Sequence, residues 1–276
     1  MTEVEISELV PGDRRGFEGY AAVWNTVVPR EPVTAQEIEA RRSREGDRSF
    51  AARVDWAIAG CASAVRSHLP GRTYVAIAVL PEFRRRGVGS ALLARALDVA
   101  RAHGSQLISL EVEEGDAAGA AFGARLGLVP RMREVEESRR LRGDEPEPEP
   151  PAGIELVVAA SRPGLVEAAY EVARSALAEL PLPAAYEISP FERWAAEEAT
   201  GDGVIAEATL VALDGDQVVG FAGLLRRRAD PRLAEHGITV VAPTHRNRGI
   251  ATALKQAQIA WAARHGYREL MTFTQD

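Results

Sequence analysis

The sequence predicts a mixed α/β fold of two tandem domains, each a largely antiparallel sheet flanked by helices. Three observations lead to this prediction. The chain has 276 residues, a length that suits about two domains. A segment rich in Glu and Pro divides it, and the two halves repeat the same order of strand-like and helix-like segments.

The dividing segment is RGDEPEPEPPAG, residues 142–153. Alternating Glu and Pro cannot continue a helix or pair in a sheet, so we expect an extended, solvated spacer. The predicted domains are therefore 1–141 and 154–276.

In the first half, strands are expected where β-branched and apolar residues cluster, and helices where apolar residues recur with helical spacing. The helix after Pro81 is expected to end at His103-Gly104, a typical C-terminal signal. The predicted elements, in chain order, are a strand 4–9, a helix, a short helix 34–44, strands 49–54, 57–66 and 73–79, a long helix, and a strand 107–112.

The second half repeats this order. Its clearest hairpin turn is Asp214-Gly215-Asp216. The predicted elements are a strand 154–159, a helix, a short helix 190–200, strands 204–213, 217–225 and 238–241, a long helix, and a strand 270–274.

The repeat is closest around one strand–loop–helix unit. PEFRRRGVGSALLARALDVARAHG begins at Pro81, and PTHRNRGIATALKQAQIAWAARHG begins at Pro243. They align without a gap at a constant offset of 162 residues. A repeat of this size indicates a duplicated fold.

The shared loop reads R-x-x-G-x-[G/A] and leads directly into the helix. The first N–H groups of a helix lack partners and, with the helix dipole, favour an anion. Gly87 and Gly249 allow close backbone approach, and the small Gly89 or Ala251 leaves room for a diphosphate. A Walker loop is excluded because the lone Lys255 lies inside the helix. A dinucleotide fingerprint fits poorly because its third glycine is missing.

With its flanks, the loop reads V-x-P-x-x-R-x-x-G-x-[G/A], at 79–89 and again at 241–251. This pattern between a strand and a helix resembles the acyl-CoA motif of the GNAT superfamily. The tandem arrangement resembles mycothiol synthase and other two-domain acetyltransferases. The resemblance implies an N-acyltransferase, with acetyl-CoA as co-substrate and no metal.

The resemblance also implies which residues hold the co-substrate. The strand backbone before each proline would pair with the pantetheine arm, and loop amides would hold the pyrophosphate. A backbone N–H at the strand end would stabilise the oxyanion. The implied residues are Val79, Leu80, Arg84, Arg85, Arg86, Gly87, Val88, Gly89 and Ser90, and Val241, Ala242, Arg246, Asn247, Arg248, Gly249, Ile250, Ala251 and Thr252.

The catalytic residues implied by the resemblance differ between the halves. Many family members protonate the leaving thiolate with a tyrosine, but Gly123 stands at that place in FGARLGL. The strand 75–79 also lacks a carboxylate or histidine, so the first domain is expected to bind acyl-CoA without turnover. In the second domain, Glu235 or His236 could serve as general base. Strict strand alternation would place Glu235 on one face with Thr239 and Val241.

The second domain ends at its fifth strand. By analogy with the first, a helix and the final strands are missing. Either the chain is truncated, or a partner or the first domain covers the exposed edge, which would otherwise invite association.

Composition restricts the remaining functions. The net charge of −7 leaves no basic stripe for nucleic acid, and no apolar run approaches the length of a membrane span. No signal peptide is recognisable, and Cys61 is the single cysteine, so the cytoplasm is expected. Direct transfer to a small, cationic amine is the favoured activity, with a homo-oligomer as an option. The alternative is a non-catalytic acyl-CoA-binding module. The sequence leaves the acceptor, the acyl chain, the active half and the oligomeric state open.

Overall fold

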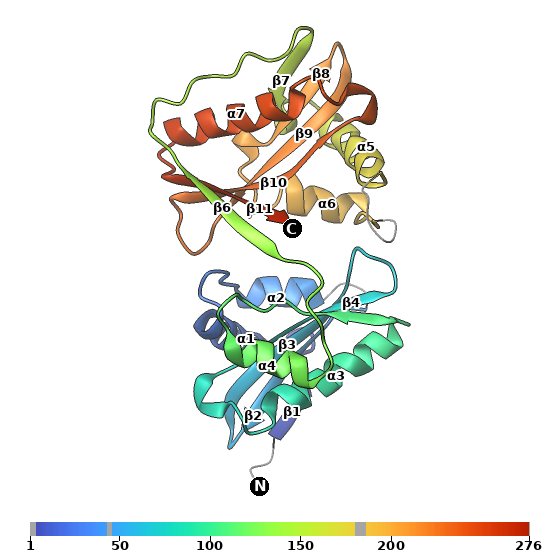
Figure 1. Cartoon of the computed structure of the whole chain (residues 1–276), viewed down its shortest axis with the longest axis vertical. Coiled ribbons are helices and arrows are strands. Elements are labelled where there is room, and N and C mark those ends of the chain that lie inside the picture. Colours follow the sequence, from blue (N-terminus) through green and yellow to red (C-terminus); the bar gives the residue numbers. More distant parts are fainter. Residues whose placement is uncertain (1–3, 43–45, 180–185, 276) are drawn as a thin grey trace. The chain divides into compact units, whose positions relative to one another are not determined.

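The computed structural model describes residues 4–42, 46–179 and 186–275. The chain forms two compact units, Met1–Val129 and Pro130–Asp276. Each unit has one mixed sheet flanked by helices, which confirms the predicted fold class (Figure 1).

The first unit has the strand order β1-β2-β3-β4-β5, antiparallel except for the parallel pair β4–β5. Helix α1 packs Phe17 and Tyr20 on one face of the sheet, and α3 packs Val88 and Leu92 on the other. The strands are β1 (Val4–Glu8), β2 (Arg48–Val54), β3 (Ala57–Arg66), β4 (Arg72–Val79) and β5 (Leu107–Ser109). The helices are α1 (Arg14–Val27), α2 (Ala35–Arg42), α3 (Val88–Ala102) and α4 (Ala117–Arg125).

The second unit has the strand order β6-β11-β10-β9-β8-β7. Helices α5 and α6 pack on one face around Trp194 and Phe221, while α7 packs Ile250 and Leu254 on the other (Figure 1). The strands are β6 (Glu134–Arg140), β7 (Ile154–Val158), β8 (Leu210–Asp214), β9 (Gln217–Arg226), β10 (Leu233–Val241) and β11 (Glu269–Gln275). The helices are α5 (Leu165–Leu177), α6 (Phe191–Glu198) and α7 (Ile250–Arg264).

Local sequence explains where several helices begin. The Asp13 side chain accepts a hydrogen bond from the Gly16 amide at 3.0 Å and caps α1. Thr34 and Glu37 form a reciprocal capping box at the start of α2, because each side chain accepts from the other's backbone amide.

Strand β6 changes the predicted domain boundary. Residues 134–140 were expected in the first domain, yet they pair antiparallel with β11 along its whole length, from Glu269↔Arg140 to Gln275↔Glu134. The edge of β11 is thus covered by an upstream segment of the same chain. Most β6 side chains are charged and exposed, which suits a sheet edge.

The segment 142–153 forms no helix or strand and is mostly exposed, as its composition predicts, but two of its glutamates contact the second unit. The Glu145 side chain is only 2% exposed and accepts a hydrogen bond from Arg139 at 2.6 Å. Glu147 pairs with Arg264 of α7. These two ion pairs attach an otherwise exposed segment to the second unit.

Three predicted strands have different limits. The expected strand 204–213 is a strand only over 210–214, because Ala206–Ala208 form a 3₁₀ turn. Strand β10 begins at Leu233 rather than 238, because its polar first half pairs with β9 and β11. Strand β5 ends at Ser109 rather than 112.

Candidate functional site

The central strand of each unit leaves part of one edge outside the neighbouring ladder. Strand β10 pairs with β11 only over Leu233–Glu235, although β10 continues to Val241. Strand β4 likewise pairs with β5 only over Arg72–Tyr74 and continues to Val79. Such a strand edge offers N–H and C=O groups to an extended ligand, as the pantetheine assignment requires.

Strand β10 also contains an irregularity that β4 lacks. The pairing of β9 with β10 shifts between His236 and Thr239, so that Gly237 and Ile238 together oppose Gly223. The pairing of β3 with β4 has no such shift. A β-bulge of this kind redirects side chains and is over-represented beside active sites.

The bulge reverses the predicted placement of Glu235. Strict alternation put Glu235 on one face with Val241, but the extra residue changes the phase of the strand. Val241 packs with Ile250 and Leu254 of α7, and the His236 ring reaches Gln258 of the same helix. His236 therefore shares the α7 face with Val241, and Glu235 points toward the opposite face.

The two glycine loops have matching backbone geometry. A 3₁₀ turn follows each strand, Pro81–Phe83 (η1) or Pro243–His245 (η4). Two left-handed residues then precede the helix. They are Arg85 (φ 63°) and Gly87 (φ 87°) in the first unit, and Asn247 (φ 62°) and Gly249 (φ 80°) in the second.

This geometry suits an anion. Gly87 and Gly249 are the N-caps of α3 and α7, and neither helix has a side-chain cap. The first amides of each helix are therefore available to a ligand. A Cβ at Gly87 would meet nothing within 4 Å, and a Cβ at Gly249 would meet only Pro151 at 3.8 Å. Neither glycine is crowded on the side where a Cβ would point, so this side does not obstruct an anion at these amides.

The arginines of the first loop have no carboxylate partners among the described residues. Arg84 donates to the Val79 carbonyl at 3.1 Å, and Arg86 lies over the Phe83 ring at 5.7 Å. These side chains can turn toward an anion without breaking an ion pair.

The basic residues of the second loop are already paired. Arg246 lies 2.9 Å from Glu179, and Arg248 lies 3.1 Å from Asp214. His245 lies 3.3 Å from the same aspartate. The second loop thus offers the same backbone N–H donors as the first. Its arginine charges, unlike those of the first loop, are largely neutralised by nearby carboxylates.

The remaining predicted cofactor residues divide into two groups. The amides of Leu80 and Ala242 donate to Ala59 and Val219 of the neighbouring strands at 3.0 and 2.8 Å, so neither amide is available to a ligand. The other positions lie at the strand end or in the first helical turn; they are Val79, Val88, Gly89, Ser90, Val241, Ile250, Ala251 and Thr252.

The two predicted base candidates are both engaged. Glu235 accepts a hydrogen bond from Arg227 at 2.8 Å, and Arg227 also lies 3.6 Å from Glu136 of β6. His236 Nδ1 lies 2.8 Å from Gln258 Oε1. Because Gln258 Nε2 donates to two backbone carbonyls, its Oε1 is an acceptor and His236 Nδ1 carries the proton.

Burial lowers the pKa of His236 to about 4, and the nearby charge of Lys255 acts in the same direction. The ring is therefore neutral at pH 7, with its lone pair on Nε2.

Sequence reasoning missed Glu198, the last residue of α6. Its Oε2 accepts a hydrogen bond from the Ile238 amide, inside the bulge, at 3.2 Å. Burial raises the pKa of Glu198, and the negative charges of Glu197 and Glu235 add to the increase. The sequence offers one hint, a glycine in each of two neighbouring strands, Gly223 and Gly237. That these glycines lie opposite each other becomes clear only when the strand register is known.

The first unit has no side chain at the position that the resemblance assigns to the thiolate acid. Gly123 lies in α4 with no side chain, and the neighbouring Phe122 ring lies 3.6 Å from the position of a Cβ at Gly89. Burial raises the pKa of the Cys61 thiol, which therefore stays protonated and is a poor nucleophile. His103 is held by Thr73 at 3.0 Å and by the Gly46 carbonyl at 2.6 Å.

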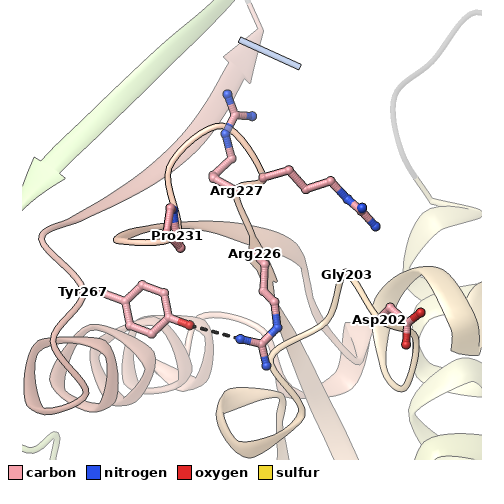
Figure 2. A pocket seen from close by; sticks show the side chains of 7 residues that line it. Asp202, Gly203, Arg226, Arg227, Pro231 and Tyr267 are labelled. Carbon is pink, nitrogen blue, oxygen red and sulfur yellow. Dashed lines mark hydrogen bonds between the residues drawn. The ribbon is translucent and has the colours of Figure 1, made fainter. Parts of the chain in front are cut away.

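A separate pocket of about 350 Å³ lies beside the ends of β9 and β10 (Figure 2). The Arg226 guanidinium donates to the Tyr267 hydroxyl at 3.5 Å across it. Its lining residues are Asp202, Gly203, Arg226, Arg227, Arg228, Pro231 and Tyr267. Three arginines suit an anionic group better than a cationic amine.

Residues 180–185, in a segment that the resemblance assigns to the acceptor wall, lie outside the described residues. Tyr186 follows directly; burial raises its pKa, and the charges of Glu198 and Glu197 act in the same direction. This places Tyr186 on the Glu198 side of the second unit. Within the described part of the chain, every helix is too short or too polar to cross a membrane.

Comparisons with known proteins agree with this geometry. The acetyltransferase (GNAT) family model matches residues 16–128 and 169–276, one region in each unit. No curated protein matches the chain. A GCN5-related N-acetyltransferase from Sphaerobacter thermophilus is 22% identical, with a TM-score of 0.71, over 99% of this chain and 87% of that one. A tandem GNAT protein from the clavulanic acid biosynthesis pathway is 20% identical, with a TM-score of 0.73, over 99% and 90%. The chain belongs to the GNAT acetyltransferase family and has its tandem, two-domain form.

Proposed function

We propose that this N-acetyltransferase moves an acetyl group from acetyl-CoA to a small, cationic amine by direct transfer, and that the second unit catalyses the reaction. Family membership already implies an acyl-CoA co-substrate. The observation that carries the proposal is the combination found in the second unit. An uncapped helix N-terminus at Gly249, a free edge on β10 and a β-bulge beside a partly buried carboxylate occur together there.

Different parts of the second unit would bind different parts of acetyl-CoA. Loop amides from Arg248 to Thr252 would hold the pyrophosphate, and the β10 edge would align the pantetheine arm toward the bulge. A backbone N–H on the free edge of β10, near the bulge, would stabilise the oxyanion as the amine attacks the thioester carbonyl. Holding both reactants in this way would remove the need for a covalent enzyme intermediate.

The acceptor class follows from the charge around the bulge. Glu197, Glu198 and Glu235 interact electrostatically on the α6 side of the sheet. Among them, Glu197 pairs with Arg193 at 3.1 Å and Glu235 with Arg227 at 2.8 Å. Glu198 has a backbone partner only, which leaves a net negative surface that favours a positively charged acceptor.

The first unit supports a binding role. It has the same loop geometry, but the strand 75–79 carries neither a carboxylate nor a histidine. We propose that it holds a second acyl-CoA without turnover.

The test is amine-dependent release of free CoA thiol from acetyl-CoA, measured with spermidine, tobramycin and glucosamine. Turnover with one of these amines, lost in the Gly249→Glu variant and kept in Gly87→Glu, is the expected result. Binding of acetyl-CoA without turnover of any amine would instead favour the non-catalytic binding module.

A further inference from the structure

We propose that Glu198 of α6, rather than the strand carboxylate Glu235, binds the acceptor ammonium and takes its proton. This inference rests on the proposed function and assigns its acceptor-side residue. It is drawn from the position of the Glu198 carboxylate, its surroundings and its lack of a cationic partner.

The Glu198 carboxylate packs against two glycines of the sheet, Gly237 and Gly223. A Cβ at Gly237 would come within 3.1 Å of Oε2, and one at Gly223 would come within 3.4 Å of it. A larger residue at either glycine position would push the carboxylate away from the sheet. The carboxylate therefore reaches the bulge of β10, where the Ile238 amide donates to it at 3.2 Å.

The bulge is also where the ligand-binding edge of β10 begins. Pairing with β11 ends at Glu235, and the free edge runs from His236 to Val241 toward the loop at Gly249. A thioester aligned along this edge would have its acyl end near the bulge. Glu198 approaches the bulge from the α6 side, so an amine bound to it would face the acyl group.

Glu198 has the electrostatic properties of a general base. Burial raises the pKa of its carboxyl, the charges of Glu197 and Glu235 raise it further, and the Ile238 hydrogen bond opposes them. The facing Tyr186 has a raised pKa and stays neutral. No basic side chain among the described residues pairs with Glu198, so its charge is available to an ammonium group.

Glu235 is the weaker candidate for the base because its negative charge is already paired with Arg227. Its carboxylate is 20% exposed and accepts from Arg227, which is 13% exposed, at 2.8 Å. The positive charge of Arg227 neutralises the negative charge of Glu235, which leaves less charge to attract an ammonium group. Glu235 instead raises the proton affinity of Glu198 through its negative charge.

Glu198 accepts one proton from the ammonium group, and the neutral amine nitrogen forms a C–N bond to the acetyl carbon. The C–S bond breaks, and the thiolate takes the second nitrogen proton to give the thiol. Glu198 then returns its proton to water.

The experiment compares Glu198→Gln, Glu235→Gln and Glu192→Gln in the full chain. Glu192 lies on the same helix and is exposed, so it provides a matched control. Each variant is measured for acetyl-CoA affinity by calorimetry, unfolding midpoint, and the pH profile of kcat/KM with the amine that the wild type acetylates best.

Glu198→Gln is expected to lower kcat/KM by about 10²–10⁴-fold. It should also remove the acid limb of the pH profile. Acetyl-CoA affinity should be unchanged, and the unfolding midpoint should be equal or higher because a buried charge and its repulsion are removed. Glu235→Gln should cost less activity and keep the acid limb, at a lower pH, because one of the charges that raise the Glu198 pKa is gone. Glu192→Gln should match the wild type.

Two results would overturn the inference while leaving the proposed function in place. In the first, Glu198→Gln turns over normally with an unchanged pH profile. In the second, Glu235→Gln alone removes the acid limb. A wild-type protein that binds acetyl-CoA but acetylates none of the three amines would overturn the proposed function and, with it, this inference.

Discussion

Asp214, at the end of β8, holds two basic side chains of the second cofactor loop. It lies 3.1 Å from Arg248 and 3.3 Å from His245. Replacement by asparagine would remove the carboxylate and free Arg248 for the pyrophosphate. We therefore predict that Asp214→Asn tightens acetyl-CoA binding at the second loop.

The size of the effect follows from exposure. Both partners of the Arg248–Asp214 pair are 39% exposed, so solvent screens much of their interaction. Exposed pairs of this kind contribute about 0.2–1 kcal/mol. Transfer of that interaction to the ligand would lower Kd by up to about fivefold.

The assay is calorimetry in a Gly87→Glu background, which leaves the second loop as the only intact site. Asp216→Asn is the matched control, because Asp216 lies in the same turn, is exposed and makes the same charge change. Affinity should rise for Asp214→Asn only, and the gain should shrink with added salt. An equal gain in Asp216→Asn, or none in Asp214→Asn, would refute a contact between Arg248 and the pyrophosphate.

Three further predictions concern stability and reactivity. The depressed pKa of His236, about 4 against 6.5 unfolded, means that the unfolded chain binds more protons between these values. The free energy of unfolding should thus fall by roughly 1.4 kcal/mol per pH unit between about pH 6.5 and pH 4. Denaturant melts at a series of pH values should show a steeper fall for the wild type than for a His236→Asn variant. Arg139→Ala should destabilise the second unit by about 1–3 kcal/mol, since it leaves the 2%-exposed Glu145 carboxylate without its 2.6 Å partner. In urea melts, Arg139→Ala should cost less stability in a Glu145→Gln background than in the wild type. The same loss in both backgrounds would contradict the pairing. Cys61 is buried and should react with a thiol reagent only on unfolding; fast labelling of native protein would be inconsistent with that burial.

The sequence was sufficient for features that depend on local residues. The glycine loops, the helices that follow them and the repeated order of elements all come from short patterns. Gly87 and Gly249 have the left-handed conformations that their role requires, with φ of 87° and 80°. The hairpin at Asp214-Gly215-Asp216 also joins β8 to β9 as predicted.

The sequence could not supply features that depend on pairing between distant segments. Strand β6, EVEESRR, is too polar to be recognised as a strand, and only its pairing with β11 makes it one. The segment 142–153 is largely exposed, as predicted, but the pairing of Glu145 and Glu147 with arginines of the second unit could not be read from its composition.

The base candidates show the same limit at the site. Glu235 and His236 were found by position along a strand, but a bulge changes which face each one occupies. Glu198 comes from a helix and meets the bulge only in three dimensions. Strand phase and helix packing are set by tertiary contacts, so a residue of this kind is not visible in a pattern.

The central claim is that backbone amides at two helix N-termini hold acyl-CoA. Its most direct test is calorimetry of acetyl-CoA with the wild type and with the Gly87→Glu and Gly249→Glu variants. Glutamate there places bulk, negative charge and a strained left-handed backbone where the pyrophosphate is expected. We predict that the wild type binds and that each variant loses one site. A wild type that binds no acyl-CoA, or two variants that bind like the wild type, would contradict the account.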